Sequence, residues 1–229
     1  MPQDFQVLPS RGFEASRNSV LRNTYRLLGI SMLPTAVGAM IGVNTSFAFL
    51  AASPMMGSLL FMAVVYGLFF AIERNKNSST GVYLLLGLTF ILGFMLGPIL
   101  QYTLHFRNGG PLIGLAAGGT GVTFLALSAL GADTRRNFSG MANFLAVGAI
   151  ILLVASIANI FLQLPMFQLA MAGAFMIFSS LMIVYQVNEI VRGGETNYIT
   201  ATLSLYISIY NIFVSLLQLL GAFGGSNRD

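Results

Sequence analysis

The chain has 229 residues, of which 56% are hydrophobic and only 8% are charged, and its formal net charge is +4. Soluble globular domains carry about 25% charged residues, so this composition excludes that class and predicts a polytopic membrane protein. The chain has no cysteine, which excludes disulfides, thiol nucleophiles and cysteine metal sites. Its first 24 residues contain no apolar core long enough for a secretory signal, so the first helix is expected to act as the insertion signal.

Seven apolar segments are long enough to cross, as helices, a bilayer core of about 30 Å. They are predicted at residues 25–44, 54–72, 81–104, 111–132, 141–162, 166–186 and 198–220. Pro54, Pro111 and Pro165 stand at or just before segment starts, where a missing amide proton costs least. Pro34 and Pro98 lie inside segments and are expected to kink the first and third helices.

The segments divide the chain into three expected parts. Residues 25–221 form the predicted transmembrane domain of seven helices, residues 1–24 a flexible cytoplasmic tail, and residues 222–229 a short outer tail. The amino-terminal tail is expected to be flexible because it is polar, lacks helical periodicity and contains two prolines and a glycine.

The basic residues predict the orientation of the chain in the membrane. Only Arg107 and Arg228 lie on one side of the predicted spans, and nine basic residues lie on the other. Since cytoplasmic loops are enriched in Lys and Arg, the amino terminus is expected in the cytoplasm, and an odd number of spans then places the carboxyl terminus outside. The nine are Arg11, Arg17, Arg22, Arg26, Arg74, Lys76, Arg135, Arg136 and Arg192.

Small residues four positions apart predict close helix packing. The pairs are Gly38 with Gly42, Gly93 with Gly97, and Gly114 with Gly118. This spacing lets two backbones approach each other and is typical of helix contacts in membranes. The third pair opens the run GLAAGGTG, which lacks the lysine that a phosphate-binding loop needs.

The last segment carries a polar stripe. Residues three and four positions apart share one helix face, and here that face holds Asn197, Ala201, Ser204, Ser208, Asn211, Ser215 and Gln218. Hydrocarbon offers hydroxyls and amides no partner, so other helices or a wet cavity must lie beside this face. We therefore expect the last helix to be central in the bundle. The stripe is interpreted either as helix packing or as a path for ions or protons.

Titratable groups are too few to predict an enzyme. None of the seven acidic residues is expected at mid-membrane, and the only histidine, His105, lies in an outer loop. Neither a carboxylate pair nor a metal site is indicated, so no catalytic residue and no cofactor is predicted. His105 is interpreted as an interfacial loop residue or, alternatively, as a pH sensor.

The polar cluster YQVNEIVRGGETNYI joins the last two segments. Gly193 and Gly194 allow a tight reversal, Thr196 or Asn197 can cap the last helix, and Glu195 favours the positive end of that helix. The junction motif comprises Gly193, Gly194, Glu195, Thr196, Asn197 and Tyr198. Gln186 and Asn159 are expected in apolar surroundings, where each needs a hydrogen-bond partner. The polar stripe of the last segment is the expected source of these partners. The candidate polar core or pore comprises Asn159, Gln186, Asn188, Glu189, Ser204, Ser208, Asn211 and Ser215.

The same cluster carries a resemblance to a known family. The pattern NxIxxGGETNYIxATxSLYxSxYNIFVSLL resembles the carboxyl-terminal signature of the Bax inhibitor-1 superfamily, in particular its bacterial inner-membrane, YccA-like branch. The stretches VLRNTYRLL, LGPIL and ANIFLQLP are also similar to that branch. The resemblance implies seven helices around a central last one. It also implies a non-enzymatic protein of the bacterial inner membrane that binds and modulates a membrane AAA protease of the FtsH type.

Other members of this superfamily are pH-sensitive calcium leaks with two facing aspartates. The matching positions here hold Gln186 and Ser208, and neither side chain titrates in the physiological range. The calcium-leak mechanism is therefore not carried over, although Glu189, three positions beyond Gln186, is an alternative acid. A cation leak or proton-linked transport protein remains the alternative function.

Overall fold

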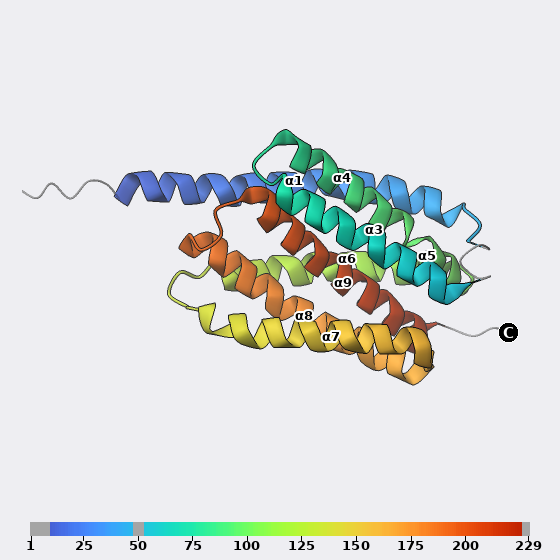
Figure 1. The fold of residues 1–229 in the computed structure, drawn as a ribbon. Coiled ribbons are helices and arrows are strands. Elements are labelled where there is room, and N and C mark those ends of the chain that lie inside the picture. Colours follow the sequence, from blue (N-terminus) through green and yellow to red (C-terminus); the bar gives the residue numbers. More distant parts are fainter. Residues whose placement is uncertain (1–9, 48–52, 226–229) are drawn as a thin grey trace, which may run out of the picture.

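The computed structural model describes residues 10–47 and 53–225 (Figure 1). These residues form helices and connections without a strand, which confirms the predicted all-α class for the described part of the chain. In chain order the elements are α1 (Ser10–Val43), α3 (Pro54–Arg74), α4 (Ser79–Phe94), α5 (Gly97–Leu104), α6 (Gly109–Gly131), the 3-10 turn η1 (Ser139–Met141), α7 (Ala142–Leu162), α8 (Pro165–Arg192) and α9 (Tyr198–Gly224).

The prediction of seven membrane-spanning helices is confirmed. Within the described ranges, seven helical stretches are long and apolar enough to cross a membrane. Each contains most of one predicted segment, and they run over Asn18–Val43, Met55–Arg74, Ser79–Leu104, Gly109–Gly131, Ser139–Leu162, Pro165–Arg192 and Tyr198–Gly224. Large apolar side chains such as Phe70 and Met40 are exposed on the flanks of the bundle, as expected where lipid replaces water.

The amino-terminal boundary of the first helix differs from the prediction. Because α1 begins at Ser10, residues 10–24 are helical, and the expectation of a flexible tail is wrong for them. Residues 1–9 lie outside the described part. Figure 1 shows the start of α1 projecting beyond the other helices as an arm. At the other terminus α9 continues to Gly224, so the predicted outer tail begins later, and residues 226–229 also lie outside the described ranges.

The two internal prolines have different effects. Pro98 stands in the first turn of α5, and the third span is interrupted there because α4 ends at Phe94 and α5 begins at Gly97. The predicted kink of the third helix is therefore confirmed as a break. By contrast, α1 continues through Pro34 without interruption.

Two of the three glycine pairs pack helices closely. Adding a Cβ at Gly38 would overlap the Phe90 carbonyl oxygen, and adding one at Gly93 would overlap the Thr35 carbonyl oxygen. Gly42 and Gly97 approach each other in the same crossing of α1 with α4 and α5. The prediction is wrong for Gly114 and Gly118, where an added Cβ would meet nothing within 4 Å.

The last helix is packed against other helices along most of its length. All its residues from Tyr198 to Gly221 are buried or half-buried, and α9 contacts α1, α3, α4, α5, α6 and α8. Leu205 and Ile212 are fully buried in the main hydrophobic cluster, which also takes residues from α1, α3, α4 and α8.

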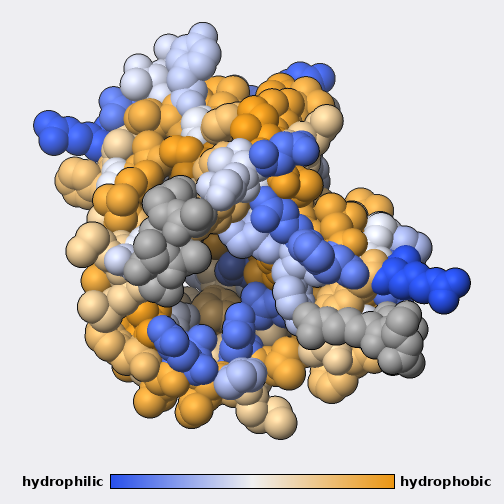
Figure 2. All heavy atoms as spheres, turned by 90° about the vertical axis from the view of Figure 1, so that its right-hand side faces the viewer, coloured by the Kyte–Doolittle hydropathy of each residue, from blue (hydrophilic) through white to orange (hydrophobic). Residues whose placement is uncertain are grey.

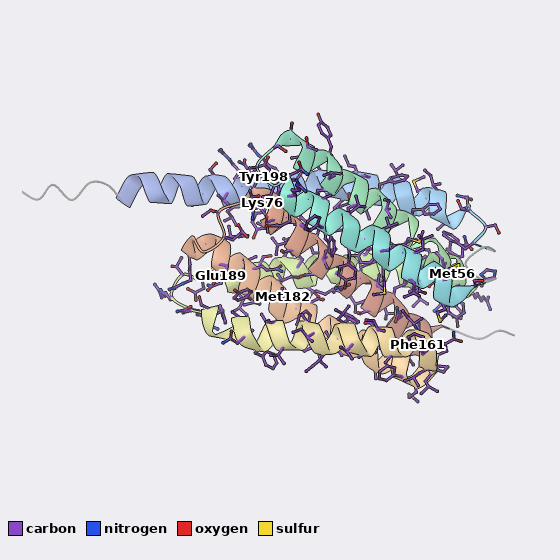
Figure 3. All side chains as sticks on the ribbon, viewed as in Figure 1. Met56, Lys76, Phe161, Met182, Glu189 and Tyr198 are labelled. Carbon is purple, nitrogen blue, oxygen red and sulfur yellow. The ribbon has the colours of Figure 1, made fainter. Side chains whose placement is uncertain are left out.

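The two ends of the bundle differ in polarity from its flanks. Lys76, Glu189 and Tyr198 lie at one end, and Met56 and Phe161 lie near the other (Figure 3). Figure 2 looks onto this second end, where hydrophilic residues gather inside a hydrophobic surround. We call the end that holds Glu189 the junction end.

Candidate functional site

The reversal between α8 and α9 depends on one glycine. Gly193 has a φ of 82°, in the left-handed region that favours glycine, and it ends α8. The Gly194 amide then donates to the Glu189 carbonyl oxygen at 2.8 Å, and the Glu195 amide donates to the same oxygen at 3.2 Å. The predicted tight turn is confirmed, and the carbonyl groups of Glu189 and Ile190 near the end of α8 are satisfied within it.

Asn197 caps α9 and also holds a second connection. Its Oδ1 accepts hydrogen bonds from the amides of Ile199 at 2.9 Å and Thr200 at 3.2 Å, which confirms one of the two predicted caps. Its Nδ2 donates to the Lys76 carbonyl oxygen at 2.9 Å and to Asn77 Oδ1 at 2.9 Å. One side chain thus joins the start of α9 to the connection between α3 and α4. Thr196 is exposed beside it.

Asn188 forms a similar clamp on the connection between α6 and α7. The side chain is fully buried, and its Nδ2 donates to the carbonyl oxygens of Gly131 at 3.0 Å and Arg136 at 3.1 Å. Its Oδ1 accepts from the Phe138 amide at 3.1 Å. All these partners lie at the junction end. Asn188 therefore clamps this connection and does not line the polar core or pore for which it was a candidate.

Glu189 and Glu195 also hold backbone and loop groups at the junction end. Glu189 accepts a hydrogen bond from the Ser139 hydroxyl of η1 at 3.0 Å, and Glu195 accepts one from the Asn197 amide at 2.7 Å. Nearby, the hydrogen bond from Lys76 to Glu73 raises the pKa of the lysine above its ordinary value. Glu189 thus bonds the η1 turn.

Gln186 and Ser208 face each other across α8 and α9. The Ser208 hydroxyl, in a side chain that is only 4% exposed, lies 3.4 Å from Gln186 Oε1. It also lies 3.0 Å from the Ser204 carbonyl oxygen, one turn earlier in α9. The expectation that Gln186 finds its partner in the polar stripe is confirmed. Two uncharged groups thus stand where the calcium-leak members of the resembled superfamily have facing aspartates.

Three further stripe residues, Asn211, Ser215 and Gln218, border a small polar cavity between α7, α8 and α9. Its volume is about 240 Å³. Asn159 lies in its wall, and within the described part of the chain its buried Oδ1 has no hydrogen-bond partner, so the expected bond from the stripe is not formed. The polar side chains in the wall are Ser156, Asn159, Gln168, Asn211, Ser215 and Gln218. Ser208 thus makes the Gln186 contact, three later stripe residues border this cavity, and the three stripe residues before Ser208 do neither.

A second group of side chains in α9 was not indicated by the sequence. The Tyr206 hydroxyl lies 2.7 Å from Thr35 Oγ1 of α1, and the Tyr210 hydroxyl donates to the Leu92 carbonyl oxygen at 3.2 Å. The two rings stack with centroids 6.3 Å apart. Periodicity places a tyrosine on a face, but it does not identify a hydroxyl partner on a helix far away in the chain.

The described residues give no group of three or more His, Asp or Glu side chains that could hold a metal ion. The acidic side chains of the junction end bond to loop groups, while the polar cavity is lined by amides and hydroxyls. Such neutral groups can hold water or weakly coordinate a cation, and they supply no general acid or base near pH 7.

Comparison with known proteins agrees with this arrangement. The family model for the inhibitor of apoptosis-promoting Bax1 matches residues 17–225. An uncharacterised protein of Neisseria meningitidis serogroup A is 45% identical over 93% of this chain and 94% of its own length. The Escherichia coli K12 protein named "Modulator of FtsH protease YccA" is 41% identical over 90% of this chain and 91% of its own.

A third relative, an uncharacterised protein of Pseudomonas aeruginosa, is 37% identical over 98% of this chain and 99% of its own length. The Escherichia coli O6:H1 counterpart of the modulator is named an inner membrane protein, in agreement with the predicted location in the bacterial inner membrane. Matches of this extent confirm the resemblance drawn from the carboxyl-terminal signature. The chain belongs to the Bax inhibitor-1 family of membrane proteins.

Proposed function

We propose that the protein binds and modulates a membrane AAA protease of the FtsH type, without catalytic residues of its own. The observation that carries this proposal is the 41% identity, over 206 residues, to the relative named as a modulator of FtsH. The likeness spans 90% of the chain, so it concerns the whole bundle and not one motif. The neutral polar groups of the bundle support a role in binding.

Orientation is part of this proposal. We infer that α9 is the central helix and that the junction end faces the cytoplasm. The burial of α9 along its length supports the first inference. Basic residues support the second, because Arg107 is the one basic residue near the opposite end within the described ranges, and cytoplasmic ends are enriched in Lys and Arg.

The arm of α1 is the part best placed to meet a cytoplasmic protease. With 34 residues, α1 is about 51 Å long at 1.5 Å per residue, well above a hydrocarbon core of about 30 Å. The bundle behind it is joined by close glycine crossings and internal hydrogen bonds, which oppose extraction. A protease that holds the arm but extracts the bundle only slowly stays bound to this protein. It then degrades its other substrates more slowly.

Co-purification tests the partner. The full chain, isolated from native bacterial membranes in mild detergent, is expected to retain a membrane AAA protease that mass spectrometry identifies. Recovery of the intact bundle without any such protease, under conditions that keep the protease itself assembled, would overturn the proposed function.

Deletion of residues 2–12, which removes the first three residues of α1 and the chain ahead of them, tests whether the protease grips the amino-terminal end. Arg17, Arg22 and Arg26 remain, so the topology is expected to survive, while the lifetimes of this protein and of a known membrane substrate of the protease should change. Deleting 226–229 at the opposite terminus is the control. If the first deletion leaves both lifetimes as in the full-length protein, the contact lies among the membrane helices instead.

The polar cavity supports a second candidate function, a path for a cation or for protons. Asn211, a stripe residue of α9, lies in the wall of the cavity. Ser208 lies about one turn before Asn211 on the same face of the helix. In this proposal, the contact between Gln186 and Ser208 is the closed point of the path. Because neither group ionises near pH 7, opening is expected to be independent of pH.

A further inference from the structure

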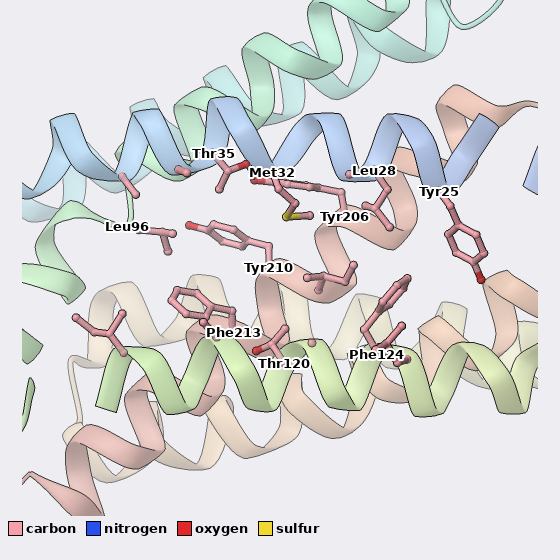
Figure 4. Close-up of a pocket in the computed structure, with 18 of the residues that line it drawn as sticks. Tyr25, Leu28, Met32, Thr35, Leu96, Thr120, Phe124, Tyr206, Tyr210 and Phe213 are labelled. Atoms are coloured by element: carbon pink, nitrogen blue, oxygen red, sulfur yellow. Dashed lines mark hydrogen bonds between the residues drawn. The ribbon is translucent and has the colours of Figure 1, made fainter. Parts of the chain in front are cut away.

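A large apolar slot separates α1 from α6. Its volume is about 840 Å³, within the range of about 300 to 1,000 Å³ typical of ligand pockets. Figure 4 shows α1 along one side, α6 along the other, and Tyr206, Tyr210 and Phe213 of α9 between them. We call this space the lateral slot.

The rim of the lateral slot is made of small residues. Gly29 and Ala36 of α1 and Ala117 and Gly121 of α6 line it and are exposed on the flank of the bundle. A Cβ added at Gly29 or Gly121 would meet nothing within 4 Å. The slot therefore opens sideways, toward the position of lipid, and its opening is wide because the rim lacks side chains.

The interior of the lateral slot offers almost no polar group to a ligand. Thr35 donates to the Ser31 carbonyl oxygen at 2.8 Å, and Thr120 donates to the Ala116 carbonyl oxygen at 2.7 Å. The hydroxyls of Tyr206 and Tyr210 also have partners inside the bundle. An occupant of this interior must be apolar, since a polar one would lose its hydrogen bonds without replacement.

The end of the slot toward the junction is polar and basic. Ser128, only 7% exposed, lies there beside Tyr25, and both residues line this end of the slot. Arg22 precedes Tyr25 by three positions and Arg26 precedes Gly29 by three, so both lie next to the slot-lining face of α1. Both arginines are exposed, and neither forms an ion pair with another described residue.

The slot is long enough to span one leaflet. Tyr25 and Ala39, the first and last residues of α1 in its wall, are fourteen positions apart, a rise of about 21 Å. Half of a bilayer core of about 30 Å is about 15 Å. An acyl chain that enters beside Tyr25 can therefore lie in the slot over the full depth of its leaflet.

We propose that the lateral slot binds one acyl chain of an anionic phospholipid, whose phosphate is held by Arg22 and Arg26 and whose ester region meets Ser128. Apolar contact with the chain and electrostatic attraction to the headgroup act together. Basic residues beside a membrane helix attract anionic lipid, so lipid charge is expected to govern occupancy.

Photo-crosslinking tests the site in the full-length protein reconstituted into nanodiscs. The probe is phosphatidylglycerol with a diazirine in the middle of one acyl chain, and labelled peptides are identified by mass. We expect labelling of Met32 and Phe124 in the slot, in addition to the general labelling of lipid-facing flanks. Labelling of the flanks alone would overturn the proposal.

Two glycines of α6 provide matched variants. Gly121→Leu fills the rim of the slot and should abolish slot labelling. Gly118→Leu, which also adds a side chain where a Cβ meets nothing, lies outside the slot lining and should leave slot labelling intact. Equal slot labelling in both variants contradicts the proposal, provided both elute as the native protein does.

The headgroup is tested separately. The double variant Arg22→Gln and Arg26→Gln should lose the preference for phosphatidylglycerol over phosphatidylcholine. The same change at Arg135 and Arg136, also near the junction end but on the connection after α6 and not beside Tyr25 or Gly29 of α1, should keep it. Loss of preference in both double variants would mean that the charge of the whole end, and not this site, attracts the lipid.

Discussion

A single side chain, that of Asn188, supplies three hydrogen bonds to a connection that lacks regular structure over much of its length. It donates hydrogen bonds to the carbonyl groups of Gly131 and Arg136, and it accepts one from the Phe138 amide. Because the side chain is fully buried, water cannot replace these bonds.

Asn188→Ala is therefore expected to lower the free energy of unfolding by about 1 to 3 kcal/mol. Thermal unfolding in detergent would measure the loss. Asn44→Ala is the control, because that exposed amide bonds only within its own helix and its loss should change little. Equal effects of the two changes would show that the clamp adds nothing to stability.

Ser208 provides a second test at the residue scale. Ser208→Leu places a bulky apolar group in a close contact with α8, so it is expected to shorten the half-life of thermal inactivation in detergent. Leu216→Ile, at a half-buried apolar position of the same helix, should be mild. If both variants inactivate at the same rate, the stripe faces open space.

The crossing of α1 with α4 and α5 depends on where each glycine lies. Gly93→Ala is expected to cost about 1 to 3 kcal/mol, since the added methyl group overlaps backbone atoms of Thr35. Gly114→Ala, made at the same four-residue spacing but in open space, should be neutral. Melting temperatures in detergent compare the two, and a neutral Gly93→Ala would mean that the crossing adjusts without cost.

These glycines also show what the sequence can and cannot predict about an element. Hydrophobic length was sufficient to locate the seven spans, because a helix must cover the apolar thickness of the bilayer. The spacing of Gly114 and Gly118 is the same as that of Gly38 and Gly42, yet only the second pair has a neighbouring backbone. Contact depends on which helices are adjacent, and local spacing does not contain that information.

The start of α1 was missed for a different reason. Ahead of Asn18 the sequence has no apolar periodicity, and periodicity was the signal used to find helices. Arginine, alanine and glutamate in this stretch are good helix formers, and a helix that already exists in the membrane can extend by adding one hydrogen bond per residue. The extension therefore needs no buried face of its own.

At the scale of the whole molecule, the candidate polar set divides into separate places. The need of Gln186 for a partner was predictable from its position in an apolar segment, and the stripe was correctly named as the source. The partners of Asn188 are backbone groups 50 or more positions away, which no side-chain pattern records. The lateral slot was not predictable from the sequence either, because it depends on how far apart α1 and α6 lie in the fold.

The uncharged contact between Gln186 and Ser208 predicts a pH-independent response. Calcium entry into proteoliposomes that contain the protein alone should show no switch between pH 6 and 8, on either side of the unperturbed His pKa of about 6.5. Dye-loaded vesicles would measure the flux. A leak that closes steeply in this interval would contradict the prediction and direct attention to His105 and Glu189.

The clamps at the helix ends use neutral amides. Asn188 and Asn197 hold the junction end, and Gln101 of α5 donates near the opposite end to the carbonyl oxygens of Gly42 and Val43, at 3.0 Å each. Dissolved salt reduces the Debye length from about 10 Å at 0.1 M to about 3 Å at 1 M, which weakens contacts between exposed charges but not these. The connections held by these amide hydrogen bonds should therefore be equally stable at low and at high salt concentration. The protein can thus keep these loops in place when the osmotic conditions around a bacterial cell change.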